Sequence, residues 1–450
     1  MRKSILYVGL LSLFCMSLLP GCRNAEAPVR ENNEAVLVRE NDEAAPVQES
    51  SEAAAPETAD IADASAGSVE TAQDADPEEP DLEGTDEESA GEDAAAEEIQ
   101  KILENMTLEE KVCQLFIITP EQLTGVDTAV QAGDATREAY EACPVGGLVY
   151  FAKNLQDPEQ TRAMLENTAR YAEERMGFPV FLAVDEEGGQ VARIAGNPAF
   201  DVPEFPSLSE IGAGGDTAGD YELGEQIGSY LKELGFNMNM APVADVLTNP
   251  ENTVVKERAF SSDPETAGRM ALAEWQGLKD QGILGVYKHF PGHGGTAGDS
   301  HNGYAYVDDT LEELKSGAFV PFQEGIDEGI PVIMAGHISC PQVTGDDTPA
   351  TMSYTLITEI LRGDMGFDGI VVTDALNMGA VTEQYTSGEA ALTALNAGVD
   401  LLLMPEDFQD AYQAVLQAAE NGELPEARID ESVERILKVK IQMIGEDVVE

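Results

Sequence analysis

Short apolar runs alternate with amphipathic stretches along most of the chain after residue 98. Continuous apolar runs of this kind are typical of parallel strands that are buried on both faces. They predict strands at 113–118, 147–151, 180–184, 237–241, 283–288, 332–335, 370–373 and 400–404. Amphipathic spacing predicts helices at 158–175, 217–234, 264–280, 310–329, 355–364, 388–397 and 407–419, and a last helix at 425–443.

Eight strand units joined by helices in one chain predict an α/β fold, namely a closed (β/α)8 barrel of the TIM type. An open doubly wound sheet is the less favoured arrangement. No Gly-x-Gly-x-x-Gly motif follows the first apolar run, which argues against a dinucleotide-binding fold. We therefore expect a single catalytic domain over residues 99–450, without a second globular domain after the barrel.

Residues 1–22 have the pattern of a lipoprotein signal peptide. Arg2 and Lys3 precede an apolar run that ends at Leu19, which is short for a membrane span of ~20 residues. The sequence Leu-Pro-Gly-Cys that ends at Cys22 resembles a lipobox. Acylation of the Cys22 thiol would anchor the protein by lipid to the outer face of the cell membrane. The alternative is cleavage elsewhere, with release of the protein.

Acidic residues dominate residues 23–98, where 25 Asp and Glu stand against three Arg. This composition offers too little apolar surface to offset the entropy of the chain, so it predicts a disordered acidic linker. The formal net charge of the whole chain is −60 at pH 7. Such a charge repels the phosphate backbone and argues against a nucleic acid partner.

The cysteines that follow the signal peptide, at 22, 113, 143 and 340, are widely spaced and mostly lie in apolar surroundings. Their spacing indicates no disulfide framework. Because free cysteine behaves as a small apolar residue, we expect buried thiols at the last three positions.

Polar residues close several of the predicted strands. Asp185 follows the third apolar run, Lys288 and His289 end the fifth, and Asp374 follows the seventh. The carboxyl ends of barrel strands meet at one rim, where active sites lie. Three of the four histidines also fall in the glycine-rich stretch 288–301. We therefore expect the active site at this rim.

Three motifs stand out at the predicted rim. They are Asp-Glu-Glu-Gly-Gly-Gln-Val-Ala-Arg at 185–193, Lys-His-Phe-Pro-Gly-His-Gly at 288–294 with Asp-Ser-His at 299–301, and Phe-Asp-Gly-Ile-Val-Val-Thr-Asp at 367–374. Together they closely resemble glycoside hydrolase family 3, in particular its β-N-acetylhexosaminidase (NagZ-like) branch. The resemblance covers residues 99–443. It implies a (β/α)8 barrel that needs no cofactor. The implied activity is removal of terminal β-linked N-acetylglucosamine with retention of configuration.

The resemblance also implies catalytic roles. Asp374 would be the nucleophile that attacks the anomeric carbon. His301 would protonate the leaving oxygen and then activate water, with Asp299 orienting its imidazole. In the β-glucosidase branch this acid/base is typically a Glu on a C-terminal domain, and the chain stops where that domain would begin. The barrel is therefore expected to supply its own proton donor.

Charged side chains read adjacent sugar hydroxyls well because they form paired hydrogen bonds. By resemblance, the residues that would hold the non-reducing sugar are Asp185, Arg193, Arg258, Lys288 and His289. We expect His293 to brace the loop and His337 to be structural. Gly295 departs from the pattern, since relatives usually carry Asp there.

Other functions stay open at this point. A metal site at His289, His293, Asp299 and His301 is chemically plausible, but Lys288 beside it and a retaining mechanism argue against one, so we expect no metal. A histidine acid/base would not repel phosphate, which leaves a phosphorylase as an alternative, together with a β-glucosidase or β-xylosidase. A binding protein without activity is disfavoured because all three catalytic residues are present. We expect a monomer that acts on a small glycan, with peptidoglycan fragments, chitin oligosaccharides and host glycans as candidate substrates.

Overall fold

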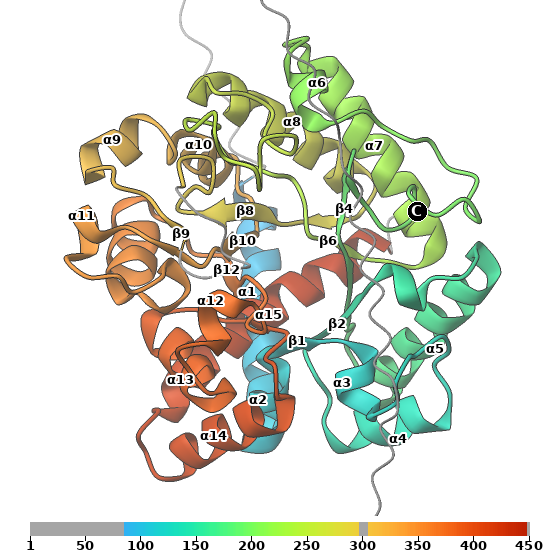
Figure 1. The fold of residues 1–450 in the computed structure, drawn as a ribbon. Coiled ribbons are helices and arrows are strands. Elements are labelled where there is room, and N and C mark those ends of the chain that lie inside the picture. Colours follow the sequence, from blue (N-terminus) through green and yellow to red (C-terminus); the bar gives the residue numbers. More distant parts are fainter. Residues whose placement is uncertain (1–84, 297–304, 448–450) are drawn as a thin grey trace, which may run out of the picture. The chain divides into compact units, whose positions relative to one another are not determined.

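Parallel strands form the centre of the fold (Figure 1). The computed structural model describes residues 85–296 and 305–447. One sheet has the strand order β13-β1-β2-β3-β6-β7 and another has the order β12-β10-β8. Their bounds are β1 Phe116–Ile118, β2 Gly147–Tyr150, β3 Phe181–Val184, β6 Met238–Asn239, β7 Leu284–Gly285, β8 Tyr287–Phe290, β10 Val332–Ala335, β12 Ile370–Thr373 and β13 Leu402–Leu403. All pairs within these two sheets are parallel, so the predicted α/β fold is confirmed.

The two sheets are linked at both edges. A parallel bridge joins Val243, just after β6, to Lys288 in β8, and another joins Val372 in β12 to Leu401, just before β13. The backbone N–H of Thr373 also donates to the carbonyl of Leu401 at 2.9 Å. Both edge strands of the three-stranded sheet, β8 and β12, are therefore bridged to segments that flank β6 and β13.

Four short strands lie outside these sheets. An antiparallel hairpin directly after β3 consists of β4 Glu186–Gly188 and β5 Val191–Ala192. The parallel pair β9 Ala305–Tyr306 and β11 Ile338–Ser339 follows the loops after β8 and β10. These additions extend the chain at the carboxyl ends of the parallel strands, where the site is expected.

Five helices match their predicted bounds to within one residue at each end. They are α5 Pro158–Met176, α7 Thr217–Leu234, α8 Pro264–Asp280, α13 Ser387–Ala397 and α14 Phe408–Glu420. Local chemistry explains this agreement. Asp157 and Asp263 each cap a helix that begins with Pro, while Gly177 and Gly235 end α5 and α7 in the left-handed conformation.

Two predicted helices have a different form. The stretch 310–329 is divided into α9 Leu311–Ser316 and α10 Val320–Asp327, because Gly317 ends the first and Pro321 lies in the first turn of the second. The stretch Thr355–Asp364 is a π-helix. The shorter helices are α2 Leu108–Gln114, α3 Pro120–Thr124, α4 Asp134–Ala142, α6 Leu208–Gly212, α11 Pro341–Thr344 and α12 Gly379–Thr382.

Helix α1 (Thr85–Asn105) packs against the last helix, α15 (Glu426–Asp447), behind the strands in Figure 1. The predicted disorder of residues 23–98 is therefore wrong for its last part, from Thr85 onward. An alanine-rich stretch favours helix there, and the buried side chains of Ile99 and Leu103 anchor one face of the helix in the core. The rest of the predicted linker and signal peptide, including Cys22, lies outside the described residues.

Cys113 and Cys143 form a disulfide that joins the end of α2 to the end of α4. The expectation of buried thiols is wrong for this pair, whereas Cys340 is a buried free cysteine. The pairing follows from the packing of β1 beside β2. A hydrogen bond from the Gly146 N–H to the Cys113 carbonyl, 3.2 Å long, holds the two segments together just before these strands.

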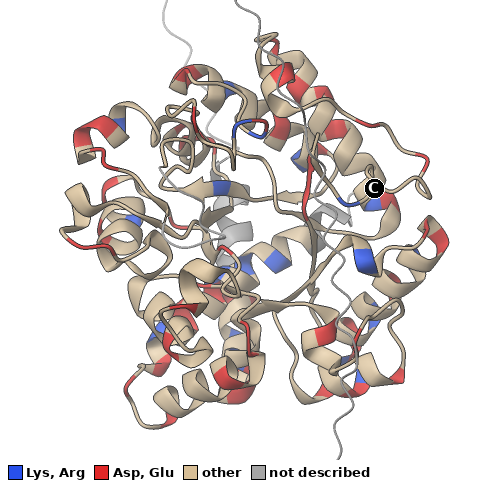
Figure 2. Ribbon diagram, viewed as in Figure 1, with Lys and Arg blue, Asp and Glu red and all other residues tan. Residues whose placement is uncertain are grey.

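Acidic side chains are spread over the outer helices, with fewer basic side chains among them (Figure 2). Among the residues that the structure describes, no helix is both long and apolar enough to cross a bilayer.

Candidate active site

A pocket of about 600 Å³ opens at the carboxyl ends of the parallel strands. All six predicted site residues that the structure describes line it: Asp185, Arg193, Arg258, Lys288, His289 and Asp374. They come from segments far apart in the sequence, as expected for residues at the carboxyl ends of separate barrel strands. The predicted acid/base pair, Asp299 and His301, lies outside the described residues.

Asp374 immediately follows β12, and its side chain is partly accessible from the pocket. Its backbone N–H donates to the carbonyl of Ala335 at 2.7 Å, and its Oδ1 accepts from the N–H of Ala375 at 2.7 Å. Burial alone would raise the pKa of Asp374, but His337, His289 and the Ala375 N–H together hold it below its usual value. The carboxylate is therefore ionised at neutral pH, as a nucleophile must be.

His337 is buried next to this carboxylate. Its Nε2 donates to the carbonyl of Ala375 at 3.0 Å, and its Nδ1 lies 2.9 Å from the hydroxyl of Thr351. The ring thus fixes the backbone that follows Asp374. This arrangement agrees with the structural role expected from the sequence.

Glu187 organises the cations of the pocket. Its carboxylate accepts from Nε and Nη2 of Arg258 at 2.7 Å each and pairs with Nζ of Lys288 at 2.6 Å. Lys288 also lies 3.2 Å from Asp185. Although burial opposes ionisation, the two cations hold the pKa of Glu187 far below its usual range. Reasoning from the sequence missed this residue, despite its place in the 185–193 motif.

The β4–β5 hairpin explains why Glu187 faces the pocket and its neighbour does not. The side chain of Glu186 is fully buried, where it accepts from the N–H groups of Ile194 and Ala195 at 2.8 Å each and from the Tyr230 hydroxyl at 2.9 Å. Successive side chains of a strand point to opposite faces, so Glu187 lies on the other side. Gly188 has a φ of 85° in the left-handed region, which glycine adopts without strain.

Asp245, a second residue that the sequence did not reveal, is fully buried behind the pocket. Its Oδ2 lies 2.8 Å from Nδ1 of His289, and its Oδ1 accepts from the N–H of His293 at 2.5 Å. His293 itself lies 2.9 Å from the Thr296 hydroxyl through Nδ1, and burial lowers its pKa. These contacts within the loop agree with the bracing role expected for His293.

Arg193 lies at the edge of the pocket, with its guanidinium 5.9 Å from the centre of the Phe151 ring. Its Nε is buried and has no hydrogen-bond partner among the described residues. A neighbouring cavity of about 450 Å³ shares Phe151, Arg193 and Met404 with the main pocket. The two spaces therefore adjoin each other, and Arg193 lines both.

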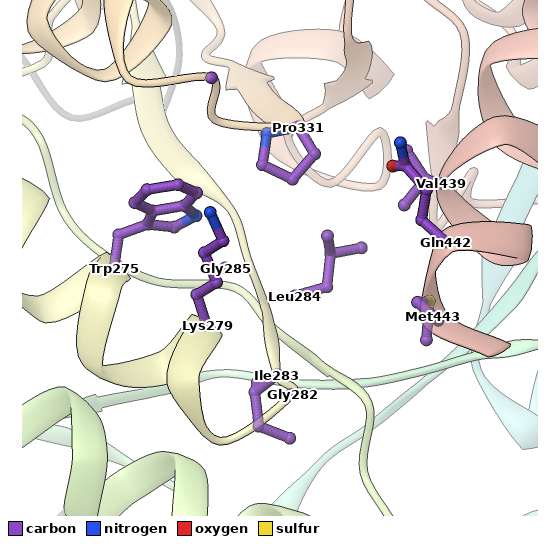
Figure 3. Close-up of a pocket in the computed structure, with 11 residues that line it drawn as sticks. Trp275, Lys279, Gly282, Ile283, Leu284, Gly285, Pro331, Val439, Gln442 and Met443 are labelled. Carbon is purple, nitrogen blue, oxygen red and sulfur yellow. The ribbon is translucent and has the colours of Figure 1, made fainter. Parts of the chain in front are cut away.

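A separate pocket of about 400 Å³ lies at the opposite, amino-terminal ends of the strands (Figure 3). Trp275, Leu284 and Pro331 line it together with Val439 and Met443 of α15. Its lining holds no Asp, Glu or His, so it offers neither a carboxylate nucleophile nor a proton donor. Over the described ranges, no group of three or more His, Cys, Asp or Glu side chains could hold a metal ion.

The family model described as "Glycosyl hydrolase family 3 N terminal domain" matches residues 107–439. The chain belongs to glycosyl hydrolase family 3. The family predicted from the three motifs is thus confirmed, and several of the similar proteins are named as β-hexosaminidases.

Three similar proteins illustrate this likeness. β-Hexosaminidase A of Pseudoalteromonas piscicida is 34% identical over 325 residues, which are 66% of this chain and 54% of that protein. β-Hexosaminidase LpqI of Mycobacterium tuberculosis is 35% identical over 58% of this chain and 68% of its own length. A solved β-N-acetylglucosaminidase of Paenibacillus sp. has a TM-score of 0.71 and 36% identity, covering 75% of this chain and 63% of that one. The chain thus spans about half of the first relative and two thirds of the others.

Proposed function

We propose that the chain is a retaining exo-β-N-acetylglucosaminidase that removes terminal β-linked N-acetylglucosamine from glycans. The observation that carries this proposal is the position of Asp374, an ionised carboxylate at the end of β12, in one pocket with Lys288, Arg258 and His289. The substrate follows the named activities of the relatives, which are β-hexosaminidases and a β-N-acetylglucosaminidase.

The reaction has two steps. Asp374 attacks the anomeric carbon and forms a covalent glycosyl enzyme while the leaving oxygen takes a proton. Water then attacks the same carbon and releases Asp374. His301 gives the proton in the first step and removes one from water in the second, and Asp299 orients its ring. A histidine suits this task because its ordinary pKa lies close to neutral pH.

The non-reducing sugar is held by the charged lining of the pocket. Lys288, Arg258 and Arg193 donate hydrogen bonds to its hydroxyl oxygens, and Asp185 accepts from its hydroxyl hydrogens. Glu187 balances two of these cations, so the pocket keeps donors without an excess of positive charge. A neutral sugar fits this balance better than an anionic one.

We further propose that the parallel strands close into a (β/α)8 barrel. The bridges Val243–Lys288 and Val372–Leu401 support this closure, because they link the two sheets at both edges. If β7 and β8 are taken as the single run predicted at 283–288, the ring has eight strand positions.

Hydrolysis of 4-nitrophenyl glycosides tests the activity. We expect turnover of the β-N-acetylglucosaminide and little turnover of the β-glucoside or β-xyloside, and the opposite preference would overturn the proposed substrate. The same assay in phosphate buffer, with product analysis, would reveal a phosphorylase through release of N-acetylglucosamine 1-phosphate.

The acid/base role of His301 has its own test. A nitrophenoxide leaves with little protonation, so His301→Ala should slow formation of the glycosyl enzyme much less for this substrate than for a disaccharide. Azide should then restore part of the rate by attacking the covalent intermediate. Asp299→Ala should show a milder form of the same pattern. Equal losses on both substrates without azide rescue would place the proton donor elsewhere.

For localisation, we propose an extracytoplasmic protein that is anchored by lipid at Cys22. The disulfide between Cys113 and Cys143 supports an oxidising compartment, since cytosolic proteins rarely keep such bonds. Cys22→Ala should leave activity unchanged but move the protein out of the membrane fraction. Retention of a lipid label by this variant would refute the anchor.

Peptidoglycan fragments are the substrate we propose in the cell, because they are the abundant β-N-acetylglucosaminides outside the cell membrane. We expect the protein to act as a monomer without a nucleic acid partner. Comparison of kcat/KM for muropeptides and for chitin disaccharide tests the preference, and a clear preference for chitin would contradict it.

A further inference from the structure

Both ring nitrogens of His289 face charged partners of opposite hydrogen-bonding type. Nδ1 lies 2.8 Å from Oδ2 of Asp245, and Nε2 lies 3.5 Å from Nη2 of Arg258. A carboxylate can only accept a hydrogen bond, and a guanidinium can only donate one. The hydrogen of the ring therefore belongs on Nδ1, and the lone pair belongs on Nε2.

The side chain of Asp245 is itself fixed by the backbone. Its Oδ1 accepts from the N–H of His293 at 2.5 Å and from the N–H of His289 at 3.3 Å, which directs Oδ2 to the ring. On the same segment, the N–H of Ala244 donates to the carbonyl of Lys288 at 2.7 Å. Asp245 is fully buried, so water does not compete for these contacts.

We propose that Asp245 is a positioning residue that holds His289 as the neutral Nδ1–H tautomer, with Nε2 presented to the pocket as a hydrogen-bond acceptor. The proposal rests on the proposed function, since it specifies how His289 meets the sugar. Asp245 itself lines no part of the pocket and acts only through the ring.

This tautomer gives the pocket a hydrogen-bond acceptor, which its cations cannot provide. Lys288 and Arg258 only donate, so they recognise hydroxyl oxygens. A neutral Nε2 accepts through a single lone pair, so a sugar hydroxyl that donates to it takes the place of the long 3.5 Å contact from Arg258. One hydroxyl can then donate to His289 while its oxygen accepts from a neighbouring cation.

Nitrogen-15 NMR of the wild-type protein tests the tautomer without any turnover. The chain has four histidines, and the signals that disappear in His289→Ala identify the ring. A proton on Nδ1 alone at neutral pH is the expected result. A proton on Nε2, or on both nitrogens, overturns the proposal whether or not the protein hydrolyses N-acetylglucosaminides.

Asp245→Asn tests the positioning role. The amide oxygen must stay on the two backbone N–H groups, so the NH2 group faces Nδ1 and moves the ring hydrogen to Nε2. Nε2–H then meets the donors of Arg258, and we expect kcat/KM to fall by roughly 10- to 100-fold, mainly through KM. The NMR signal of His289 should report the changed tautomer.

A double-mutant cycle separates this role from a general loss of structure. In the His289→Ala background, Asp245→Asn should cause little further loss, because its effect passes through the missing ring. Asp201→Asn, at an exposed position outside the pocket, is the matched control and should leave kcat/KM unchanged. Additive losses in the cycle would contradict the positioning role, and the wild-type spectrum still decides the tautomer if Asp245→Asn folds poorly.

Discussion

Glu187 accepts two hydrogen bonds of 2.7 Å from Arg258, and the Glu187 side chain is 1% exposed whereas that of Arg258 is 14% exposed. The same carboxylate also meets Lys288. One acid therefore places two cations of the pocket that we propose bind the sugar.

Glu187→Gln should weaken substrate binding without removing the nucleophile. The amide keeps the shape of the side chain but removes the carboxylate that pairs with Arg258 and leaves Lys288 with Asp185 alone, a loss worth several kcal/mol. We expect kcat/KM for a nitrophenyl substrate to fall roughly 100-fold or more, mainly through KM, with a lower Tm. Glu257→Gln, an exposed position in the same region of sequence as Arg258, is the control. Unchanged kinetics in Glu187→Gln would show that the cations hold their places alone.

Asp374→Asn should abolish turnover and leave the fold intact. The amide oxygen can still accept from the Ala375 N–H, but it cannot form the covalent intermediate. We expect kcat to fall at least about 1,000-fold, with an unchanged Tm. Steady-state kinetics and thermal unfolding measure the two effects. If the variant keeps a tenth of the wild-type rate, Asp374 is not the nucleophile.

Asp220 on α7 should make the protein less stable as the pH rises towards neutral. Its two carboxylate oxygens are buried without a hydrogen-bond partner in the described structure. Burial, with a smaller effect from Asp216, raises its pKa to about 7, whereas the unfolded chain ionises near pH 3.9. The folded state thus holds a proton that the unfolded state releases between these values, and stability falls across this range.

Asp220→Asn removes this dependence because the amide does not ionise. Urea unfolding should show a gain of roughly 2 to 4 kcal/mol near pH 8 and almost none near pH 4. Glu225→Gln, exposed on the same helix, controls for the loss of one negative charge. An equal gain at both pH values would contradict the buried ionisation.

Lys440 on α15 should make the protein more stable as the pH rises, which is the opposite of the effect of Asp220. Its ammonium is buried, donates to Oε1 of Gln114 at 2.8 Å and lies 4.8 Å from the centre of the Phe181 ring. Burial lowers its pKa to about 7, whereas the unfolded chain titrates near pH 10.4. Below pH 7 both states carry the proton and the buried charge destabilises the fold. Between pH 7 and about 10 only the unfolded state keeps the proton, so stability rises with pH.

Lys440→Met should therefore stabilise the protein most near pH 6, with a gain that shrinks as the pH approaches 10. Differences in the free energy of unfolding between variant and wild type measure this trend. Lys438→Met, exposed on the same helix, should change little at any pH. A gain that is independent of pH would mean that Lys440 is not protonated differently in the two states.

The sequence was most informative where local chemistry decides the structure. Apolar runs predicted the parallel strands, and amphipathic spacing predicted helices whose starts are fixed by local caps such as Asp157 before Pro158. Strand ends predicted Asp374 and Lys288 in one pocket. These signals depend on only a few neighbouring residues, so they can be recognised without knowledge of the fold.

Other features depend on contacts between distant segments. Nothing local distinguishes Glu187 from Glu186, since only the hairpin sends one to the pocket and the other to the core. Asp245 belongs to no motif, and its importance follows from meeting His289 across 44 residues. Helix α1 likewise packs against α15 through a distant part of the chain, which the acidic composition conceals.

The disulfide between Cys113 and Cys143 also bears on how the protein is prepared. It closes a loop of 30 residues, for which the chain-entropy estimate is about 3 to 4 kcal/mol of stability. Next to it, the Gln114 side chain donates to the Pro144 carbonyl at 2.7 Å and receives the hydrogen bond of Lys440. Protein purified from a reducing cytosol, or kept with dithiothreitol, would lose this disulfide. The disulfide lies next to the Gln114–Lys440 hydrogen bond, which connects α2 to α15. Preparations from a periplasm and from a cytoplasm are thus different starting materials for every stability measurement proposed above.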